Sequence, residues 1–142
     1  MPKRKASAIW KGDLAKGHGE MTYGDGSPID DYNTGSRFRD ATGTNPEELV
    51  GAALAGCFCM SLANRLNELG YTPQKIETQA LVDLMQIGDE HKITTIELIT
   101  DATVPDVNEE TFDEIATNTK IHCPVSQALT GVVIKMEARL KS

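Results

Sequence analysis

The chain has 142 residues, of which 39% are hydrophobic and 25% are charged, and its formal net charge is −7. This length and composition predict one globular domain that covers residues 1–142. The acidic balance argues against binding to nucleic acid, because the sequence contains no basic stripe that could neutralise phosphates.

The N-terminal segment begins with the basic residues 3–5, and the apolar run after them is short. It lacks the longer apolar core and the cleavage site of a secretory signal, so we expect a cytoplasmic protein. Residues 3–11 and 17–23 are each followed by glycine-containing turns, a pattern that predicts two strands paired in a hairpin. Residues 27–38, which include Arg37, are expected to be extended or looped.

The strongest local signal marks the start of a long helix. Asn45 is suited to the N-cap, Pro46 to the first helical position, and Glu47 and Glu48 to the first turn, where the helix dipole favours anions. Gly70 is suited to a left-handed stop. We therefore predict a helix that extends to residue 69 and is about 36 Å long.

The middle of this helix, residues 49–63, carries no charge and has small or apolar side chains on every side. It predicts a helix that is buried all round. The stretch is short for a bilayer and is flanked by charges, so we expect a soluble core helix and no membrane contact. Small residues at four-residue spacing would let another backbone approach closely, for example the same helix of a second chain; they are Gly51, Ala52, Ala55 and Gly56.

The remainder of the chain predicts two strands, two helices and a final strand. Residues 76–85 and 92–103 are rich in β-branched residues and flank a turn at 88–90. Residues 111–121 have helical spacing with Asn108 or Thr111 as the cap, Pro124 begins a short helix through residue 129, and residues 132–138 resemble a strand. This order predicts the α+β class rather than a doubly wound parallel sheet.

The chain has three cysteines, an odd number that disfavours a structural disulfide framework and leaves room for reactive thiols. The histidines share no zinc-like spacing with them, so no metal is expected. Cys57 on a buried helix would ordinarily be an inert core residue. Cys59 is two positions further on and points about 200° away, so the two cannot face one site.

Cys123 precedes a proline at a predicted helix start, where free N–H groups and the helix dipole favour a thiolate. The alternative is that Cys123 merely fills a turn. The neighbouring His122 and Ser126 raise the possibility of a hydrolase, but no G-x-S-x-G motif supports it.

Arg37 and Glu47 matter to this chemistry only if the fold brings them to Cys57. A guanidinium lowers the pKa of a nearby cysteine by favouring its charged form, and a carboxylate can hold the guanidinium in place. The simpler interpretation of Glu47 is a residue that stabilises the helix N-terminus, a role that Glu48 fits better.

Two separated motifs carry a family resemblance. The run from Gly43 to Ala53 that leads to Cys57-Phe58, together with Cys123-Pro124-Val125-Ser126, resembles the OsmC/Ohr family of thiol-dependent organic hydroperoxide reductases, with its OsmC branch the most similar. The resemblance implies a peroxidatic Cys57, a resolving Cys123, an activating Arg37 and its carboxylate partner Glu47. It also implies antiparallel sheets wrapped around a long central helix, in an intertwined homodimer with active sites at the subunit interface.

The activity implied is reduction of organic hydroperoxides to alcohols in oxidative or osmotic stress defence, through a Cys57 sulfenic acid and a Cys57–Cys123 disulfide. A dithiol of lipoyl type would restore the thiols, and no cofactor is required. The alternative is a non-catalytic protein that binds an apolar ligand in the pocket at the dimer interface. Residues that differ from common family members, and so bear on pocket shape, are Thr34, Gly35, Leu54 and Cys59.

Overall fold

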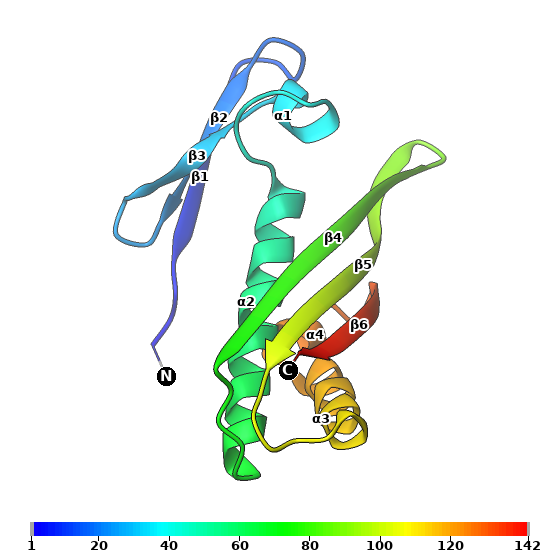
Figure 1. Cartoon of the computed structure of the whole chain (residues 1–142). Helices are drawn as coiled ribbons and strands as arrows, with labels where there is room; N and C mark the ends of the chain where they lie inside the picture. Colours follow the sequence, from blue (N-terminus) through cyan, green and yellow to red (C-terminus); the bar gives the residue numbers. More distant parts are fainter. Residues whose placement is uncertain (1, 142) are drawn as a thin grey trace. The chain divides into compact units, whose positions relative to one another are not determined.

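The computed structural model describes residues 2–141, which form two compact units divided between Leu49 and Val50. The N-terminal unit contains the first sheet, and the C-terminal unit contains the second sheet with most of the long helix (Figure 1).

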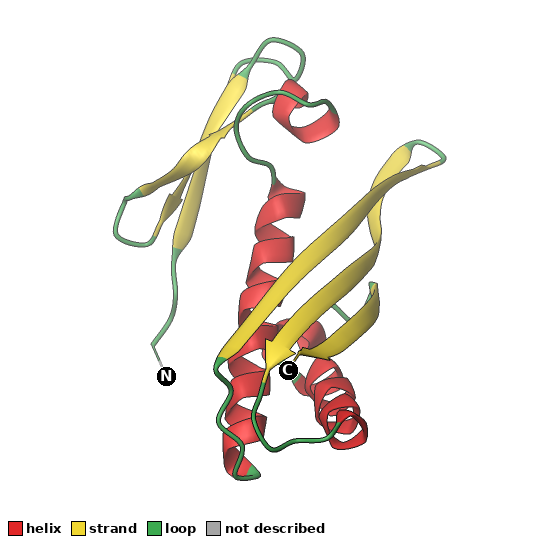
Figure 2. Cartoon of the chain, viewed as in Figure 1, coloured by secondary structure: helices red, strands yellow, loops and turns green. Residues whose placement is uncertain are grey.

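The sheet of the N-terminal unit has three antiparallel strands in the order β1-β2-β3 (Figure 2). They are β1 (Ala6–Lys11), β2 (His18–Tyr23) and β3 (Pro28–Tyr32). The predicted hairpin is confirmed, since β1 and β2 pair from Ala6↔Tyr23 to Lys11↔His18. The side chains of β1 are almost all exposed. A small sheet with so little burial needs further cover to be stable.

A short helix, α1 (Thr34–Phe38), follows β3, so the expectation that this whole segment is extended or looped was wrong. Asn33 and Ser36 form a reciprocal cap. The Ser36 N–H donates to Asn33 Oδ1 at 2.9 Å, and the Asn33 N–H donates to Ser36 Oγ at 2.8 Å. These two bonds satisfy N–H groups that a single turn of helix leaves free, which offsets the cost of Gly35 inside it.

The long helix is α2 (Pro46–Glu68), as predicted to within one residue. Asn45 caps it, because its Oδ1 accepts the Glu48 N–H at 2.8 Å. At the other end Gly70 has φ 90°, and the Tyr71 N–H donates back to the Leu66 carbonyl at 2.9 Å. Within residues 2–141, α2 is the one helix long and apolar enough to cross a membrane, a test that core helices of soluble proteins also pass.

The C-terminal unit contains a second three-stranded sheet, in the order β4-β5-β6. Its further elements are β4 (Lys75–Ile87), β5 (Glu90–Thr103), α3 (Glu109–His122), α4 (Pro124–Ala128) and β6 (Val133–Lys141). β4 and β5 form the predicted antiparallel hairpin. β6 is parallel to β5, which differs from the expectation of purely antiparallel sheets, because α3 and α4 form a crossover connection. The predicted α+β class is confirmed.

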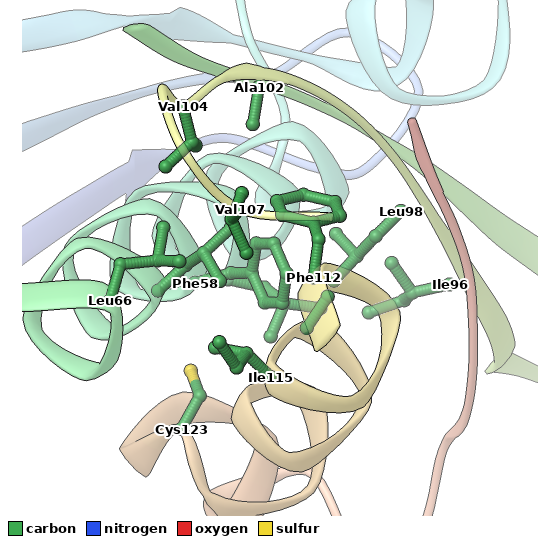
Figure 3. Packing of buried hydrophobic residues seen from close by; sticks show 13 residues of the cluster. Phe58, Leu66, Ile96, Leu98, Ala102, Val104, Val107, Phe112, Ile115 and Cys123 are labelled. Atoms are coloured by element: carbon green, nitrogen blue, oxygen red, sulfur yellow. The ribbon is translucent and has the colours of Figure 1, made fainter. Parts of the chain in front are cut away.

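The hydrophobic core of the C-terminal unit lies between one face of this sheet, α2 and α3 (Figure 3). α2 contributes one side chain per turn, β5 contributes alternate residues, and α3 contributes its inner face; the fully buried members include Leu54, Phe58, Leu62, Leu66, Ile96, Leu98 and Phe112. Leu54 is therefore a core residue. Gly51 lies close to β4, where an added Cβ would make a tight contact of 3.0 Å with Val82 Cγ2.

The opposite side of α2 is uncovered in the single chain. Ala52, Gly56 and Met60, which we call the open face of α2, are exposed, and Met60 is 78% accessible. The prediction that α2 is buried all round is thus met on one side only. An uncharged helix face of this kind ordinarily contacts another surface.

Candidate functional site

Cys57 and Cys123 meet in the C-terminal unit. Cys57 lies in the middle of α2, Cys123 is the N-cap residue of α4, and their sulfur atoms are 3.0 Å apart. Both are free thiols. A disulfide requires about 2.05 Å between the sulfurs, so a displacement of about 1 Å would allow the bond to form.

The two thiols differ in burial. Cys123 is 1% exposed, and Figure 3 shows it at the margin of the hydrophobic core with its sulfur directed toward the cluster. Cys57 is only half-buried, and the Ser61 hydroxyl, one helical turn further along α2, lies 4.0 Å from its sulfur. An external reagent therefore has easier access to Cys57 than to Cys123.

The surroundings of the two thiols separate their acidities. Burial raises the pKa of Cys57, and its hydrogen bond with Cys123 raises it further. Burial also opposes charge on Cys123, but the Cys57 S–H, the N–H and hydroxyl of Ser126 and the Val125 N–H together lower the pKa of Cys123. When the pair holds one proton, these contacts favour the thiol at Cys57 and the thiolate at Cys123.

Cys59 faces away from this pair, as the helical spacing predicted. Its sulfur donates to Thr78 Oγ1 on β4 at 3.2 Å, and Thr78 Oγ1 lies 2.8 Å from Thr100 Oγ1 on β5. This polar chain satisfies the hydroxyl of Thr100, which is fully buried. Cys59 thus has a structural role between α2 and the sheet.

We expect Cys59→Ser to form the Cys57–Cys123 disulfide with diamide as fast as the wild type, because serine keeps the hydrogen bond to Thr78 and the reacting sulfurs are untouched. Titration of free thiols should show two lost from the wild type and two from the variant. Loss of the Cys59 thiol from the wild type before that of Cys57 would contradict this assignment.

Arg37 and Glu47 form an ion pair within the N-terminal unit. Both the Nη2 and the Nε of Arg37 donate to Oε1 of Glu47, at 2.8 and 3.2 Å. The Glu47 side chain is 9% exposed and that of Arg37 is 38% exposed. The second oxygen of Glu47, Oε2, is buried and has no hydrogen-bond partner among residues 2–141. The carboxylate therefore fixes one edge of the guanidinium and leaves Nη1 available for another anion.

Local hydrogen bonds explain why this pair forms. The Asn45 side chain caps α2 and also donates to the Ser36 carbonyl at 2.9 Å, which ties α1 to the start of α2. The Glu48 N–H donates the cap bond to Asn45 Oδ1, and the Glu48 carboxylate accepts from the Thr44 hydroxyl at 3.1 Å. Glu47 is thus left to bind Arg37.

The structure brings the four predicted residues together as two pairs, Arg37 with Glu47 and Cys57 with Cys123. The first pair belongs to the N-terminal unit and the second to the C-terminal unit, so a single site made of all four stays a prediction. No cluster of three potential metal ligands occurs among the described residues.

The sequence interpretation missed the part played by two serines beside the thiols. Ser61 follows Cys57 by four residues, a spacing that places it on the same helix face. Ser126 follows Cys123 by three, where the side chain of a first-turn residue lies close to the cap. An open groove of about 320 Å³ adjoins Ser61 and Cys123, and its mostly polar lining is Met60, Ser61, Asn64, Arg65, Glu68, His122 and Cys123.

Comparison with known proteins agrees with the fold. The family model of OsmC-like proteins matches residues 39–137. Peroxiredoxin OsmC of Escherichia coli strain K12 is 41% identical over 140 residues, which cover 98% of this chain and 97% of that protein. The crystal structure of the organic hydroperoxide resistance protein OhrB of Bacillus subtilis, 28% identical, superposes with a TM-score of 0.75 over 95% of this chain and 98% of that one. An OsmC-like protein from Mycoplasma pneumoniae has the same fold, with a TM-score of 0.78 at 16% identity over 99% of both chains. The chain therefore belongs to the OsmC-like protein family.

Proposed function

We propose that this protein is a thiol-dependent peroxidase that reduces organic hydroperoxides to alcohols. The observation that carries the proposal is the 3.0 Å separation between the sulfurs of Cys57 and Cys123, one half-buried and one buried. Two thiols held this close can pass from dithiol to disulfide with little movement of the backbone. The names of the similar proteins, a peroxiredoxin and an organic hydroperoxide resistance protein, support the same chemistry.

In the proposed reaction the Cys57 thiolate attacks the distal oxygen of the hydroperoxide. The O–O bond breaks, the alkoxide takes a proton to leave as the alcohol, and Cys57 becomes a sulfenic acid. Cys123 then attacks the Cys57 sulfur and expels the hydroxyl group as water, which forms the Cys57–Cys123 disulfide. A dithiol of lipoyl type returns two electrons and two protons by thiol–disulfide exchange.

Arg37 and Glu47 are proposed to activate Cys57. The contacts within the C-terminal unit raise the pKa of Cys57 through burial and the bond with Cys123, so an additional positive charge is needed to move the thiolate onto it. Arg37 supplies that charge, and Glu47 orients it through the ion pair at 2.8 Å.

The working form is proposed to be a homodimer in the cytoplasm, with a role in stress defence. The open face of α2 is uncharged, and β1 exposes nearly all of its side chains. A second copy of the chain would cover these surfaces and remove them from water.

A charged substitution on the open face tests the dimer. Ala52 is exposed in the single chain, so Ala52→Glu should be harmless to a monomer. In a dimer that buries this face, an unpaired carboxylate should cost about 3 kcal/mol or more and prevent assembly. Asn67→Glu, at an exposed position near the end of α2, is the matched control. Light scattering should report a wild-type dimer; a well-folded wild-type monomer at micromolar concentration would refute the proposal.

An anaerobic titration tests the activity itself. Reduced protein should lose two thiols per chain for each equivalent of cumene hydroperoxide, and should react more slowly with hydrogen peroxide. The rival function, binding of an apolar ligand without catalysis, predicts no loss of thiols.

A further inference from the structure

The disulfide of the proposed cycle has two sulfurs that a reductant could attack, and the structure distinguishes them. Cys123 is 1% exposed and borders the hydrophobic core, whereas Cys57 is half-buried. An incoming thiolate must approach along the S–S axis, opposite the sulfur that leaves, so access to the attacked sulfur limits the reaction.

The Ser126 hydroxyl also distinguishes the two sulfurs, because it lies beside Cys123. Ser126 is 8% exposed, and its Oγ is buried without a hydrogen-bond partner among residues 2–141. A buried hydroxyl without a partner carries a desolvation cost and needs an explanation. Burial opposes charge on Cys123, and the contacts that lower its pKa are first the Cys57 S–H and then the Ser126 N–H, the Ser126 hydroxyl and the Val125 N–H. A mixed disulfide at Cys57 removes the first of these donors and leaves those of Ser126 and Val125 to stabilise the Cys123 thiolate.

We propose that the reductant attacks the Cys57 sulfur, and that Cys123 leaves as a thiolate that accepts a hydrogen bond from the Ser126 hydroxyl. The inference rests on the proposed function, whose disulfide it uses. Ser126 is then a donor to the leaving group. Its hydroxyl gains a charged acceptor at the moment when the S–S bond breaks.

A thiolate of the reducing dithiol forms a bond to Cys57 Sγ, the S–S bond breaks, and its electron pair passes to Cys123 Sγ. The second thiol of the reductant then gives up its proton, attacks the reductant's own sulfur in the mixed disulfide and expels Cys57, which takes up a proton as it leaves. The two protons that the reductant loses are those that Cys57 and Cys123 carry in the dithiol form. The products are the dithiol enzyme and an oxidised, disulfide form of the reductant.

If the reductant instead attacked Cys123, it would have to reach a buried sulfur, and Cys57 would be the sulfur that leaves first as a thiolate. Burial and the neighbouring Cys123 disfavour charge at Cys57. A thiol of lower pKa is the faster leaving group. Access and leaving-group stability therefore point to the same sulfur for attack.

The first test maps the mixed disulfide. Wild-type protein is oxidised with diamide, which needs no hydroperoxide, and is then treated briefly with a large excess of glutathione, a monothiol, so that the mixed disulfide is populated before the neighbouring thiol closes the disulfide again. After an acid quench, free thiols are alkylated under denaturing conditions and peptides are analysed by mass spectrometry. The adduct should be on Cys57 and the alkyl group on Cys123. An adduct mainly on Cys123, or failure of diamide to form the disulfide, would overturn the proposal.

The second test removes the hydroxyl. Ser126→Ala should slow reduction of the diamide-formed disulfide by dithiothreitol about tenfold, because the leaving thiolate loses a charge-assisted hydrogen bond. Ser126→Thr, which keeps a hydroxyl, should restore the rate. The control is Thr119→Val, because the buried Thr119 hydroxyl already donates to the Ile115 carbonyl at 2.8 Å and lies on α3. Equal slowing in Thr119→Val and Ser126→Ala would indicate a general loss of packing and would contradict a specific role.

A third measurement is independent of turnover. In a background with both Cys57→Ser and Cys59→Ser, where Cys123 is the one remaining thiol of the three, ultraviolet absorbance of the thiolate reports the pKa of Cys123, which Ser126→Ala should raise. An unchanged pKa would overturn the role of Ser126. If the protein fails to consume hydroperoxides but the adduct maps to Cys57, the peroxidase proposal fails while the direction of disulfide attack stands.

Discussion

Cys57→Ser should abolish turnover of organic hydroperoxides, because serine at this position cannot form the thiolate that attacks the O–O bond. Cys123→Ser should allow one turnover and then stop. Without Cys123, which lies 3.0 Å from Cys57 in the wild type, the sulfenic acid has no internal thiol with which to condense. Stopped-flow measurement of hydroperoxide loss gives the burst, and dimedone trapping followed by mass spectrometry detects the sulfenic acid.

Cys59→Ser is the matched control for both variants, because Cys59 lies on the same helix but bonds to Thr78. It should retain multiple turnovers. Multiple-turnover activity in Cys57→Ser would refute the assignment of the attacking thiol, and undiminished cycling in Cys123→Ser with a dithiol reductant would refute the disulfide step.

Arg37→Met should slow oxidation of Cys57 by about 10² to 10³, the range for loss of a donor that stabilises charge developing in a transition state. The C-terminal unit by itself raises the pKa of Cys57. In the proposed function the guanidinium shifts the proton balance of the two thiols toward a Cys57 thiolate and also stabilises the departing alkoxide. Because the thiolate is the reactive form, loss of Arg37 should move the rise of the oxidation rate to higher pH.

Glu47→Gln should cause a smaller loss, since a glutamine can still accept one hydrogen bond from Arg37 but carries no charge. Its effect should nearly vanish in the Arg37→Met background, because Glu47 acts through Arg37. Rates across a pH series for the two single variants and the double variant measure this coupling. An unchanged pH profile in Arg37→Met, or losses that simply multiply, would refute the proposed activation.

The boundaries of α2 were predictable because the signals at its ends are local. Asn45, Pro46 and Gly70 act through the backbone within a few residues, so the sequence contains the whole interaction. The β4–β5 hairpin was predictable for a similar reason, since alternate β-branched residues pair across one turn. The parallel pairing of β6 with β5 was not predictable, because it depends on how α3 and α4 return the chain to the sheet.

α1 was missed although its cap is local. Asn33 and Ser36 have the spacing of a reciprocal cap, but Gly35 inside a five-residue helix argues against one, and the capping bonds decide the outcome. The site shows the same limit. Sequence patterns indicated Arg37, Glu47, Cys57 and Cys123. The lower pKa of Cys123, however, follows first from the Cys57 S–H and then from the N–H and hydroxyl groups around its sulfur, which only the folded chain places there.

Because Cys57 and Cys123 are far apart in sequence, reduction of a disulfide between them is linked to the stability of the folded chain. A disulfide between them would close a loop of 66 residues that contains the β4–β5 hairpin and α3. By the chain-entropy estimate, such a loop stabilises the folded state by about 4 kcal/mol at 25 °C. The same free energy must lower the reduction potential of the folded pair relative to the unfolded chain, by about 90 mV for two electrons. A substitution that loosens the contact of α3 with α2, far from either sulfur, would therefore make the disulfide easier to reduce.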